Sequence, residues 1–208
     1  TKGFLRNEQY AIALALVKAG EVVLGVMGCP NLPYAGEPGD PAATGPTGVL
    51  FVAVRGEGTR MMPLFEATAD TPGEPCQAAA PSSTAEARYA ESVEAAHSNQ
   101  SEAARIGAAL GITAEPVRLD SQTKYAMVAR GDASIYLRVP RGDYRENIWD
   151  HAAGMLVVSE AGGRVSDVEG KPFDITTGQR MTDNHGAVVT AASIHDEVVA
   201  AVRSVLEG

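Results

Sequence analysis

The run Trp149-Asp150-His151-Ala152-Ala153-Gly154 decides how this chain is expected to fold. It opens a helix that we predict to continue to about Gly162-Gly163, and its small residues leave one side bare, so that another backbone can pack close. Because residues 155–158 are all apolar, the helix is expected to be buried. Asp150 lies at its start, where unpaired backbone N–H groups and the positive end of the helix dipole favour a carboxylate. The run alone is compatible with a metal-binding Asp150 and with an N-capping Asp150 beside a packed Trp149.

Further motifs agree with this run in order and spacing. They are Thr1-Lys2-Gly3-Phe4-Leu5-Arg6, Leu119-Asp120-Ser121-Gln122-Thr123-Lys124-Tyr125, Ile135-Tyr136-Leu137-Arg138 and Glu160-Ala161-Gly162-Gly163. From Thr1 to about Ala192 the chain resembles the inositol-monophosphatase-like, lithium-sensitive, magnesium-dependent phosphatases. Within them it is most similar to the 3'(2'),5'-bisphosphate nucleotidases, which remove the 3'-phosphate from adenosine 3',5'-bisphosphate. The resemblance covers only the C-terminal part of such an enzyme.

Composition limits the kind of protein this is. The 208 residues suffice for one sizeable domain or a large piece of one, and 45% of them are apolar and 21% charged. No apolar run is long enough to cross a bilayer, and the net charge of −9 argues against binding nucleic acid. An anionic nucleotide would therefore need a local basic pocket or cations. Two cysteines, Cys29 and Cys76, are too few for a disulfide framework, so we expect an intracellular location, cytoplasmic or organellar.

Hydrophobic patterning predicts hairpins in the first part of the chain. Apolar runs at residues 10–17 and 21–27 predict a first hairpin, and residues 48–53 with 59–62 predict a second. A stretch rich in Gly, Pro and Ala at 31–46 and one rich in Pro, Ala and Ser at 67–84 predict loops.

After residue 84 the pattern predicts alternating helices and strands. Four helices are expected: one at 100–110, one that Asp120 or Ser121 caps and that ends near 130, one that starts with the run at 149–154, and one that Ser193 caps and that ends near 206. Strands are expected at 116–119, 133–139, 163–167 and 186–192. Such an order indicates mixed sheets layered with helices, an α/β (α+β mixed) class. This agrees with the layered αβαβα sandwich that the resemblance implies, here lacking its N-terminal part. We expect 1–84 to belong to the N-terminal sheet region and 85–208 to form a C-terminal α/β domain.

The resemblance implies a magnesium cofactor, with Asp150 as a metal ligand and the Thr1 hydroxyl as a catalytic group that orients the attacking water. Two magnesium-type ions can activate the water and clamp the phosphoryl oxygens. The family's other metal carboxylates belong to an earlier acidic segment and to an Asp-Pro-Ile-Asp-Gly-Thr motif, of which only Thr1 is present here. Because one carboxylate does not make a magnesium cage, we expect the isolated chain to be inactive and to need the N-terminal segment as a companion.

Residues expected to bind the substrate come from three segments. Ser121 and Lys124 are three residues apart at a predicted helix start, where a hydroxyl, an ammonium and backbone N–H groups could cradle a phosphate. Spacing alone also allows a capping Ser and a solvated Lys. The resemblance assigns both residues to the nucleotide, Lys124 to the phosphate that is not cleaved, and adds Arg138, His97 and Ser98.

Alternatives stay open at this point. One is a phosphatase acting on inositol phosphates, and another is a non-catalytic module that binds adenosine bisphosphate. The residues do not say whether 3'-phosphoadenylyl sulfate is also a substrate. His151 is expected to orient or pack beside Asp150, and Asn147 stands where these nucleotidases often carry Lys.

Overall fold

A five-stranded antiparallel sheet forms the first half of the fold. The computed structural model describes residues 2–38, 40–93, 100–139 and 142–208. After a short helix α1 (Lys2–Leu5), the strands follow one another in the sheet in the order in which they occur in the chain: β1 (Ile12–Lys18), β2 (Glu21–Ala35), β3 (Thr44–Val54), β4 (Gly58–Pro63) and β5 (Glu74–Cys76). Both predicted hairpins are confirmed, since β1 pairs with β2 and β3 pairs with β4.

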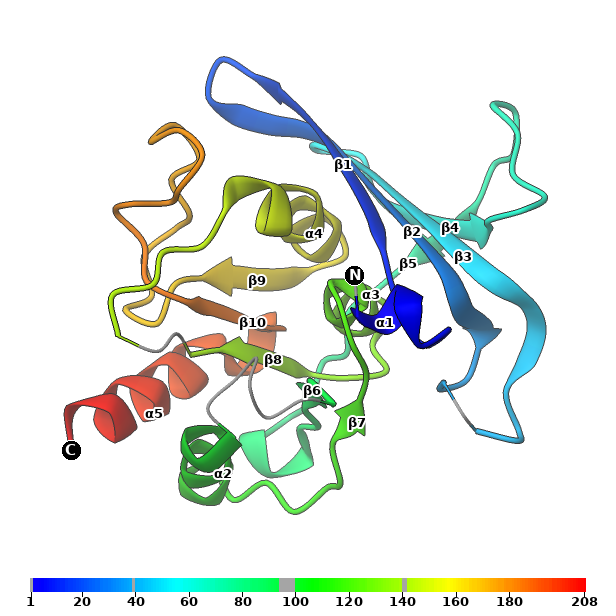
Figure 1. Ribbon diagram of the computed structural model, residues 1–208. Coiled ribbons are helices and arrows are strands. Elements are labelled where there is room, and N and C mark those ends of the chain that lie inside the picture. The colour runs from blue at the N-terminus through cyan, green and yellow to red at the C-terminus, as the bar shows by residue number, and fades with distance from the viewer. Residues whose placement is uncertain (1, 39, 94–99, 140–141) are drawn as a thin grey trace.

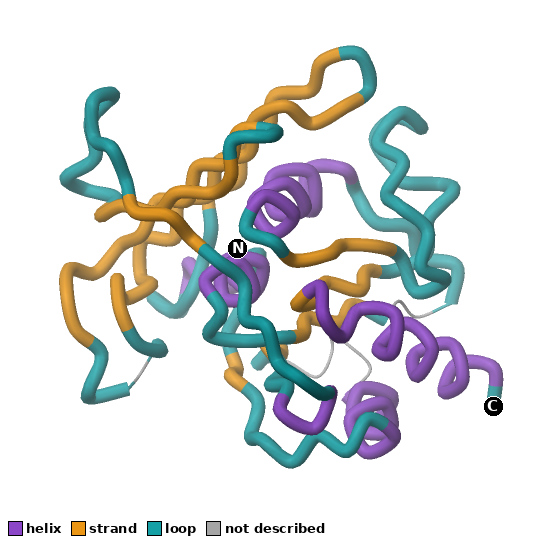
Figure 2. Tube along the Cα trace, turned by 180° about the vertical axis from the view of Figure 1, so that it is seen from behind, coloured by secondary structure: helices purple, strands orange, loops and turns teal. Residues whose placement is uncertain are grey.

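The second half of the chain builds a smaller sheet with helices on both sides. Its strands lie in the order β8 (Ile135–Arg138), β10 (Ala187–Ala191) and β9 (Gly163–Ser166). Helices α3 (Thr123–Arg130) and α4 (Ile148–Glu160) lie between the two sheets, and α2 (Gln100–Ala109) and α5 (His195–Glu207) cover the far side of the smaller sheet (Figures 1 and 2). Short elements complete the chain: a parallel pair β6 (Ala90–Glu91) and β7 (Val117–Arg118), and 3-10 turns η1 (Thr84–Glu86) and η3 (Ala192–Ile194).

Helix α4 packs closely against strand β2 and helix α3, as its small residues predict. A Cβ on Gly25 of β2 would lie 2.8 Å from the main-chain oxygen of Ala153, so the strand and the helix touch through their backbones. The apolar residues Leu156, Val157 and Val158 are buried in the same core. This core contains residues from both sides of position 84, and the proposed division into 1–84 and 85–208 stays a prediction.

Two loop predictions need correction. Strand β2 continues to Ala35 and β3 begins at Thr44, inside the stretch 31–46 that was expected to be a loop. The pairing of β2 with β3 shifts register on either side of Pro33, and such irregularities let a strand accommodate proline. The expected loop 67–84 contains β5, which pairs with β4.

The predicted helix caps are also wrong in detail. Gln122, rather than the predicted Asp120 or Ser121, is the N-cap residue of α3. Asn147 is the N-cap residue of α4, which excludes the alternative of an N-capping Asp150. Ser193 lies in the turn η3, where its hydroxyl donates to the main-chain oxygen of Pro81 instead of capping α5.

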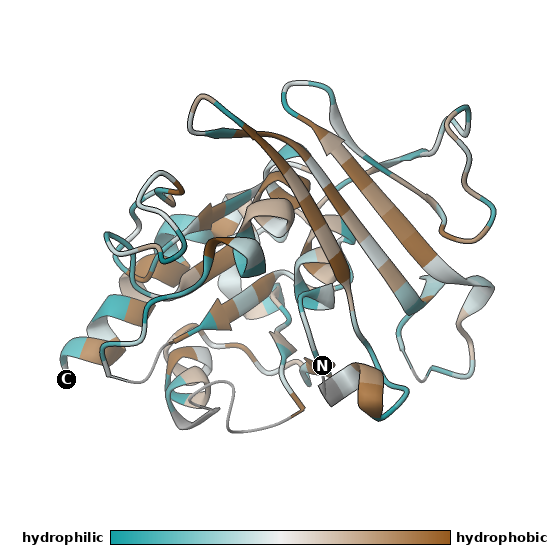
Figure 3. Cartoon of the chain, turned by 45° about the horizontal axis from the view of Figure 1, so that its top comes forward, coloured by the Kyte–Doolittle hydropathy of each residue, from teal (hydrophilic) through white to brown (hydrophobic). Residues whose placement is uncertain are grey.

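One face of the five-stranded sheet has no helices over it in the described chain. The register places Leu14 of β1, Val26 of β2 and Val52 of β3 on the same side, away from α4. We call this side the outer face; its apolar side chains are exposed or half-buried, namely Ile12, Leu14, Leu16, Leu24, Val26, Leu50, Val52 and Val54. Figure 3 shows the corresponding apolar bands along the strands. The layers described are therefore sheet, helices, sheet and helices, with the outer face of the first sheet bare.

Candidate active site

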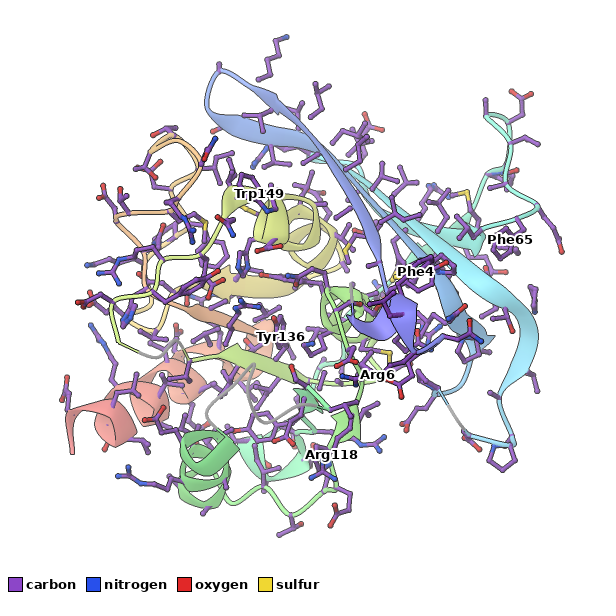
Figure 4. The ribbon with its side chains drawn as sticks, in the orientation of Figure 1. Phe4, Arg6, Phe65, Arg118, Tyr136 and Trp149 are labelled. Atoms are coloured by element: carbon purple, nitrogen blue, oxygen red, sulfur yellow. The ribbon has the colours of Figure 1, made fainter. Side chains whose placement is uncertain are left out.

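The carboxylate of Asp150 is partly exposed at the start of helix α4. Asp150 lies in the first turn of the helix, half-buried, and the side-chain amide of Asn147 donates to its Oδ2 at 3.4 Å. Trp149 is 56% exposed and lies at the start of α4, on the side of β1 (Figure 4). The interpretation of an N-capping aspartate beside a packed tryptophan is therefore wrong on both points, and the Asp150 carboxylate remains available to a ligand.

Lys124 is more deeply buried than Ser121 and Arg138, the other expected substrate-binding residues that the structure describes. Its side chain is in the first turn of α3, and the residue is 4% exposed. The ammonium donates to the main-chain oxygen of Ser121 at 2.8 Å and lies 5.3 Å from the centre of the Tyr136 ring. Burial first, and then the nearby Arg138 charge, lower the pKa of Lys124 to about 7, against the opposing effect of Asp120.

Ser121 meets Lys124 through its main chain and not through its hydroxyl. Its φ of 66° turns the backbone into the left-handed region just before α3. The hydroxyl accepts from the backbone N–H of Thr123 at 3.3 Å and shares a hydrogen bond of 2.9 Å with the Thr123 hydroxyl. The structure thus brings Ser121 and Lys124 together, while the Ser121 hydroxyl has a local partner.

Arg138 at the end of β8 is held by a buried carboxylate. Its Nε donates to Oε1 of Glu146 at 2.7 Å, and Glu146 is only 1% exposed. Burial acts to raise the pKa of Glu146, but the hydrogen bond from His151 and the charge of Arg138 outweigh it, so that this pKa is lowered. Burial also disfavours the Arg138 cation, yet Tyr136 and Glu146 raise its pKa above the usual value.

A line of buried side chains continues from Glu146 into α3. His151 is fully buried, with Nε2 3.2 Å from Oε2 of Glu146 and Nδ1 2.6 Å from the Tyr125 hydroxyl. Since an ionised carboxylate only accepts, the Nε2–H of His151 donates to Glu146, while Nδ1 shares the second hydrogen bond with the Tyr125 hydroxyl. His151 therefore orients and packs, as expected from the sequence.

Two tyrosine rings lie between the charged side chains of the site. Tyr125 of α3 and Tyr136 of β8 meet edge to face, with ring centroids 5.3 Å apart. Burial raises the pKa of Tyr125 well above its usual value, and Tyr136, Arg138, Glu146 and Asp150 are all close enough to act on it. Figure 4 shows Tyr136 on the side of β8 that faces α3. Asp150, Lys124 and Arg138 thus surround one buried aromatic pair.

The first described residues of the chain lie beside this site. Arg6 forms an ion pair with Asp120, just before α3, with 3.3 Å between Nη1 and Oδ2. In Figure 1 α1 is drawn next to α3, and a Cβ on Gly3 of α1 would lie 3.2 Å from the Cβ of Asp120. Thr1, His97 and Ser98 lie outside the described residues.

A magnesium site is not complete in the part of the chain that the structure describes. No three His, Cys, Asp or Glu side chains in these stretches come together in a way that could hold a metal ion. The Asp150 carboxylate is the kind of ligand that Mg²⁺ prefers, but several oxygen ligands are needed. The described residues therefore fit the metal only as a partial site.

Comparison with known proteins identifies the group to which this arrangement belongs. The family model described as the inositol monophosphatase family matches residues 1–207. This chain belongs to the inositol monophosphatase family. Among curated family members, a protein of Emericella nidulans named 3'(2'),5'-bisphosphate nucleotidase is 44% identical over the whole chain, and one of Schizosaccharomyces pombe with the same name is 43% identical over 99% of it. The resemblance predicted from the motifs is confirmed.

The chain spans about three fifths of the length of these family members, 61% and 57% respectively. Solved structures agree with the fold. The Thermotoga maritima inositol monophosphatase has a TM-score of 0.64 at 25% identity, covering 95% of this chain and 62% of that one. The SuhB protein of Bartonella henselae has a TM-score of 0.67 at 21% identity, covering 98% and 66%. The predicted inositol-monophosphatase-like fold is confirmed. None of the helices in the described residues is both long and apolar enough to span a membrane.

Sequence reasoning missed three buried residues that lie among the expected site residues, namely Tyr125, Tyr136 and Glu146. The two tyrosines stand inside motifs that were recognised for their neighbours Lys124 and Arg138. Glu146 follows a loop without periodicity, and only its position just before a helix rich in buried residues could have pointed to it.

Proposed function

We propose that the full-length protein is a magnesium-dependent phosphomonoester hydrolase that removes the 3'-phosphate of adenosine 3',5'-bisphosphate, and that this chain is its C-terminal part. The observation that carries the proposal is the placement of two cations, Lys124 and Arg138, around the Tyr125–Tyr136 pair next to Asp150. A substrate with two phosphates needs positive charge at a distance from the phosphate that is cleaved. The names of the relatives at 42–44% identity support the same substrate.

In this proposal each residue has a distinct task. Asp150 supplies one oxygen ligand to Mg²⁺, and the bound metal would neutralise the scissile phosphate and activate water. Lys124 and Arg138 bind the phosphate that is retained, through charge-assisted hydrogen bonds. Ser121 shapes the backbone that accepts from Lys124. Thr1, His97 and Ser98 keep the roles that the family resemblance implies, the first as the catalytic hydroxyl and the others against the nucleotide.

The proposal includes a companion for this chain. The relatives are longer by about two fifths of their length, the described residues offer one carboxylate to the metal, and the outer face of the sheet is apolar and bare. We therefore propose that the segment corresponding to the rest of the relatives covers the outer face and completes the metal site.

The test compares phosphate release by the full-length protein from adenosine 3',5'-bisphosphate and from an inositol monophosphate, each with Mg²⁺ and with a chelator. Selective, magnesium-dependent hydrolysis of the nucleotide is expected. Preference for the inositol phosphate would show that the protein is an inositol phosphatase and not a nucleotidase. Tight nucleotide binding by calorimetry without any turnover would make it a binding module.

A further inference from the structure

Glu146 differs from the other carboxylates around the site in having no access to solvent. It is 1% exposed, and each of its two carboxylate oxygens has a partner, the half-buried Arg138 for one and the fully buried His151 for the other. Oε1 accepts from Arg138 at 2.7 Å, and Oε2 faces the His151 imidazole at 3.2 Å. A buried carboxylate with both oxygens used in this way is a fixed point, not a mobile surface charge.

The backbone at Glu146 is fixed as well. The N–H of Met181 donates to the main-chain oxygen of Glu146 at 3.0 Å, and the N–H of Ile148 donates to the main-chain oxygen of Gln179 at 3.0 Å. The side chain is held at its other end by His151, whose Nδ1 lies 2.6 Å from the Tyr125 hydroxyl. A continuous set of contacts therefore runs from α3 through α4 and Glu146 to Arg138.

The contact with Glu146 occupies one edge of the Arg138 guanidinium. A guanidinium carries five N–H donors in a rigid plane, so fixing the Nε edge determines the direction of the remaining donors. Without a partner at Nε, Arg138 would keep its side-chain hydrogen bond with Tyr136 but lose the contact that fixes the direction of its plane, and binding a phosphate would then cost the entropy of ordering it.

We infer that Glu146 is a positioning residue, which acts through Arg138 to set the affinity for the phosphate that is not cleaved, with His151 and Tyr125 holding Glu146 in place. The inference rests on the proposed function, because it takes Arg138 to bind that phosphate. Glu146 itself does not touch the substrate: a carboxylate facing the phosphate would repel it. Its contribution is the geometry of the cation.

The test measures kcat and KM of the full-length protein for adenosine 3',5'-bisphosphate and for adenosine 3'-phosphate, which lacks the second phosphate. Glu146→Gln keeps the shape but places an amide group where the carboxylate stands. We expect its KM for the bisphosphate to rise about tenfold or more, the loss typical of one misplaced charge-assisted contact, with kcat and the KM for adenosine 3'-phosphate little changed. Tyr125→Phe, which removes one hydroxyl at the far end of the contacts, should raise the same KM by a smaller factor. If Glu146→Gln does not fold, this variant carries the test.

Arg138→Ala, alone and combined with Glu146→Gln, separates the inference from the proposed function. The double variant should have the same KM for the bisphosphate as Arg138→Ala alone, because Glu146 then has nothing to position. If Arg138→Ala raises that KM while Glu146→Gln leaves it unchanged, or if the two effects multiply, the inference is overturned and the proposed function stands. If Arg138→Ala leaves the KM unchanged, the assignment of Arg138 to the substrate fails, and the positioning role fails with it.

Discussion

Gly154 of α4 lies so close to the Tyr125 ring of α3 that a Cβ at position 154 would come within 2.4 Å of the ring Cγ. The ring cannot shift to make room, because Tyr125 is fully buried, packs edge to face on Tyr136 and is hydrogen-bonded through its hydroxyl to His151. One missing side-chain atom in α4 thus allows the aromatic pair at the centre of the candidate site to form.

We predict that Gly154→Ala destabilises the protein by about 1–3 kcal/mol, the usual cost of overpacking a core, even though alanine favours a helix by about 1 kcal/mol over glycine. Thermal unfolding followed by circular dichroism measures the effect. Gly107→Ala in helix α2 is the matched control, since the closest atom to its added Cβ is the edge of the Tyr89 ring at 3.3 Å. Equal melting temperatures for the two variants would contradict the close packing of Gly154 on Tyr125.

How much the sequence could predict depends on the distance over which each feature is determined. The apolar alternation of the first hairpins is a local property, and β1 to β4 were predicted from it. The continuation of β2 to Ala35 was not, because Pro30 and Pro33 normally interrupt a strand, and only the irregular pairing with β3 accommodates them.

The same reasoning separates the parts of the site. Asp150, Lys124 and Arg138 stand in recognisable motifs, and the structure brings them around one aromatic pair. Glu146 joins Arg138 and His151 only after β8 and α4 have packed together, so no spacing along the chain reveals it. The orientation of the Ser121 hydroxyl likewise depends on a left-handed backbone conformation that a serine seldom adopts.

Asp150→Asn is predicted to abolish hydrolysis by the full-length protein and to leave its fold intact. The amide keeps the size of the side chain and its contact with Asn147, but it removes the negative charge that a hard cation needs. Phosphate release at ordinary magnesium concentration measures the loss, and the melting temperature measures the fold. Asp183→Asn, which removes an exposed carboxylate, is the control and should retain activity. Near-normal turnover of Asp150→Asn would rule out its role as a metal ligand.

Lys124→Ala should raise KM for adenosine 3',5'-bisphosphate far more than KM for adenosine 3'-phosphate. The contact that is lost goes to the retained phosphate, and a charge-assisted contact is worth about 1.5–3 kcal/mol. Steady-state kinetics on the two substrates give the comparison. An equal rise on both would show that Lys124 supports the site generally and does not recognise the second phosphate.

The pH dependence of kcat/KM should report the protonation of Lys124 in the free enzyme. Burial and then Arg138 lower its pKa to about 7, against the opposing effect of Asp120, so the ammonium that binds the phosphate is present below that pH and is lost above it. We expect kcat/KM for the bisphosphate to fall as pH rises from about 7 to about 9, and kcat/KM for adenosine 3'-phosphate to fall less. Lys124→Arg remains charged over this range and should remove the difference between the two substrates. If the fall were the same in Lys124→Arg, another group would be responsible.

The last prediction concerns the bare outer face of the five-stranded sheet. Ile12, Leu14 and Leu16 of β1 are 62%, 58% and 54% exposed, and they continue into half-buried aliphatic side chains on β2 and β3. A contiguous apolar face of this kind is rarely left in contact with water, so the chain purified alone should self-associate. It should also show no magnesium-dependent phosphate release, because one carboxylate holds the metal weakly.

Adding the segment that corresponds to the remaining length of the relatives, as a separate polypeptide, should convert the chain into a defined complex and restore phosphate release. Size-exclusion chromatography with light scattering and a phosphate assay follow the two effects. Leu14→Lys should reduce self-association and prevent the rescue, because it places a charge at the centre of β1. Leu206→Lys alters an exposed leucine at the end of α5, 38% exposed, and should leave both unchanged. Full activity of the chain alone would show that the metal site is complete without a companion, and rescue of Leu14→Lys would show that the companion binds elsewhere.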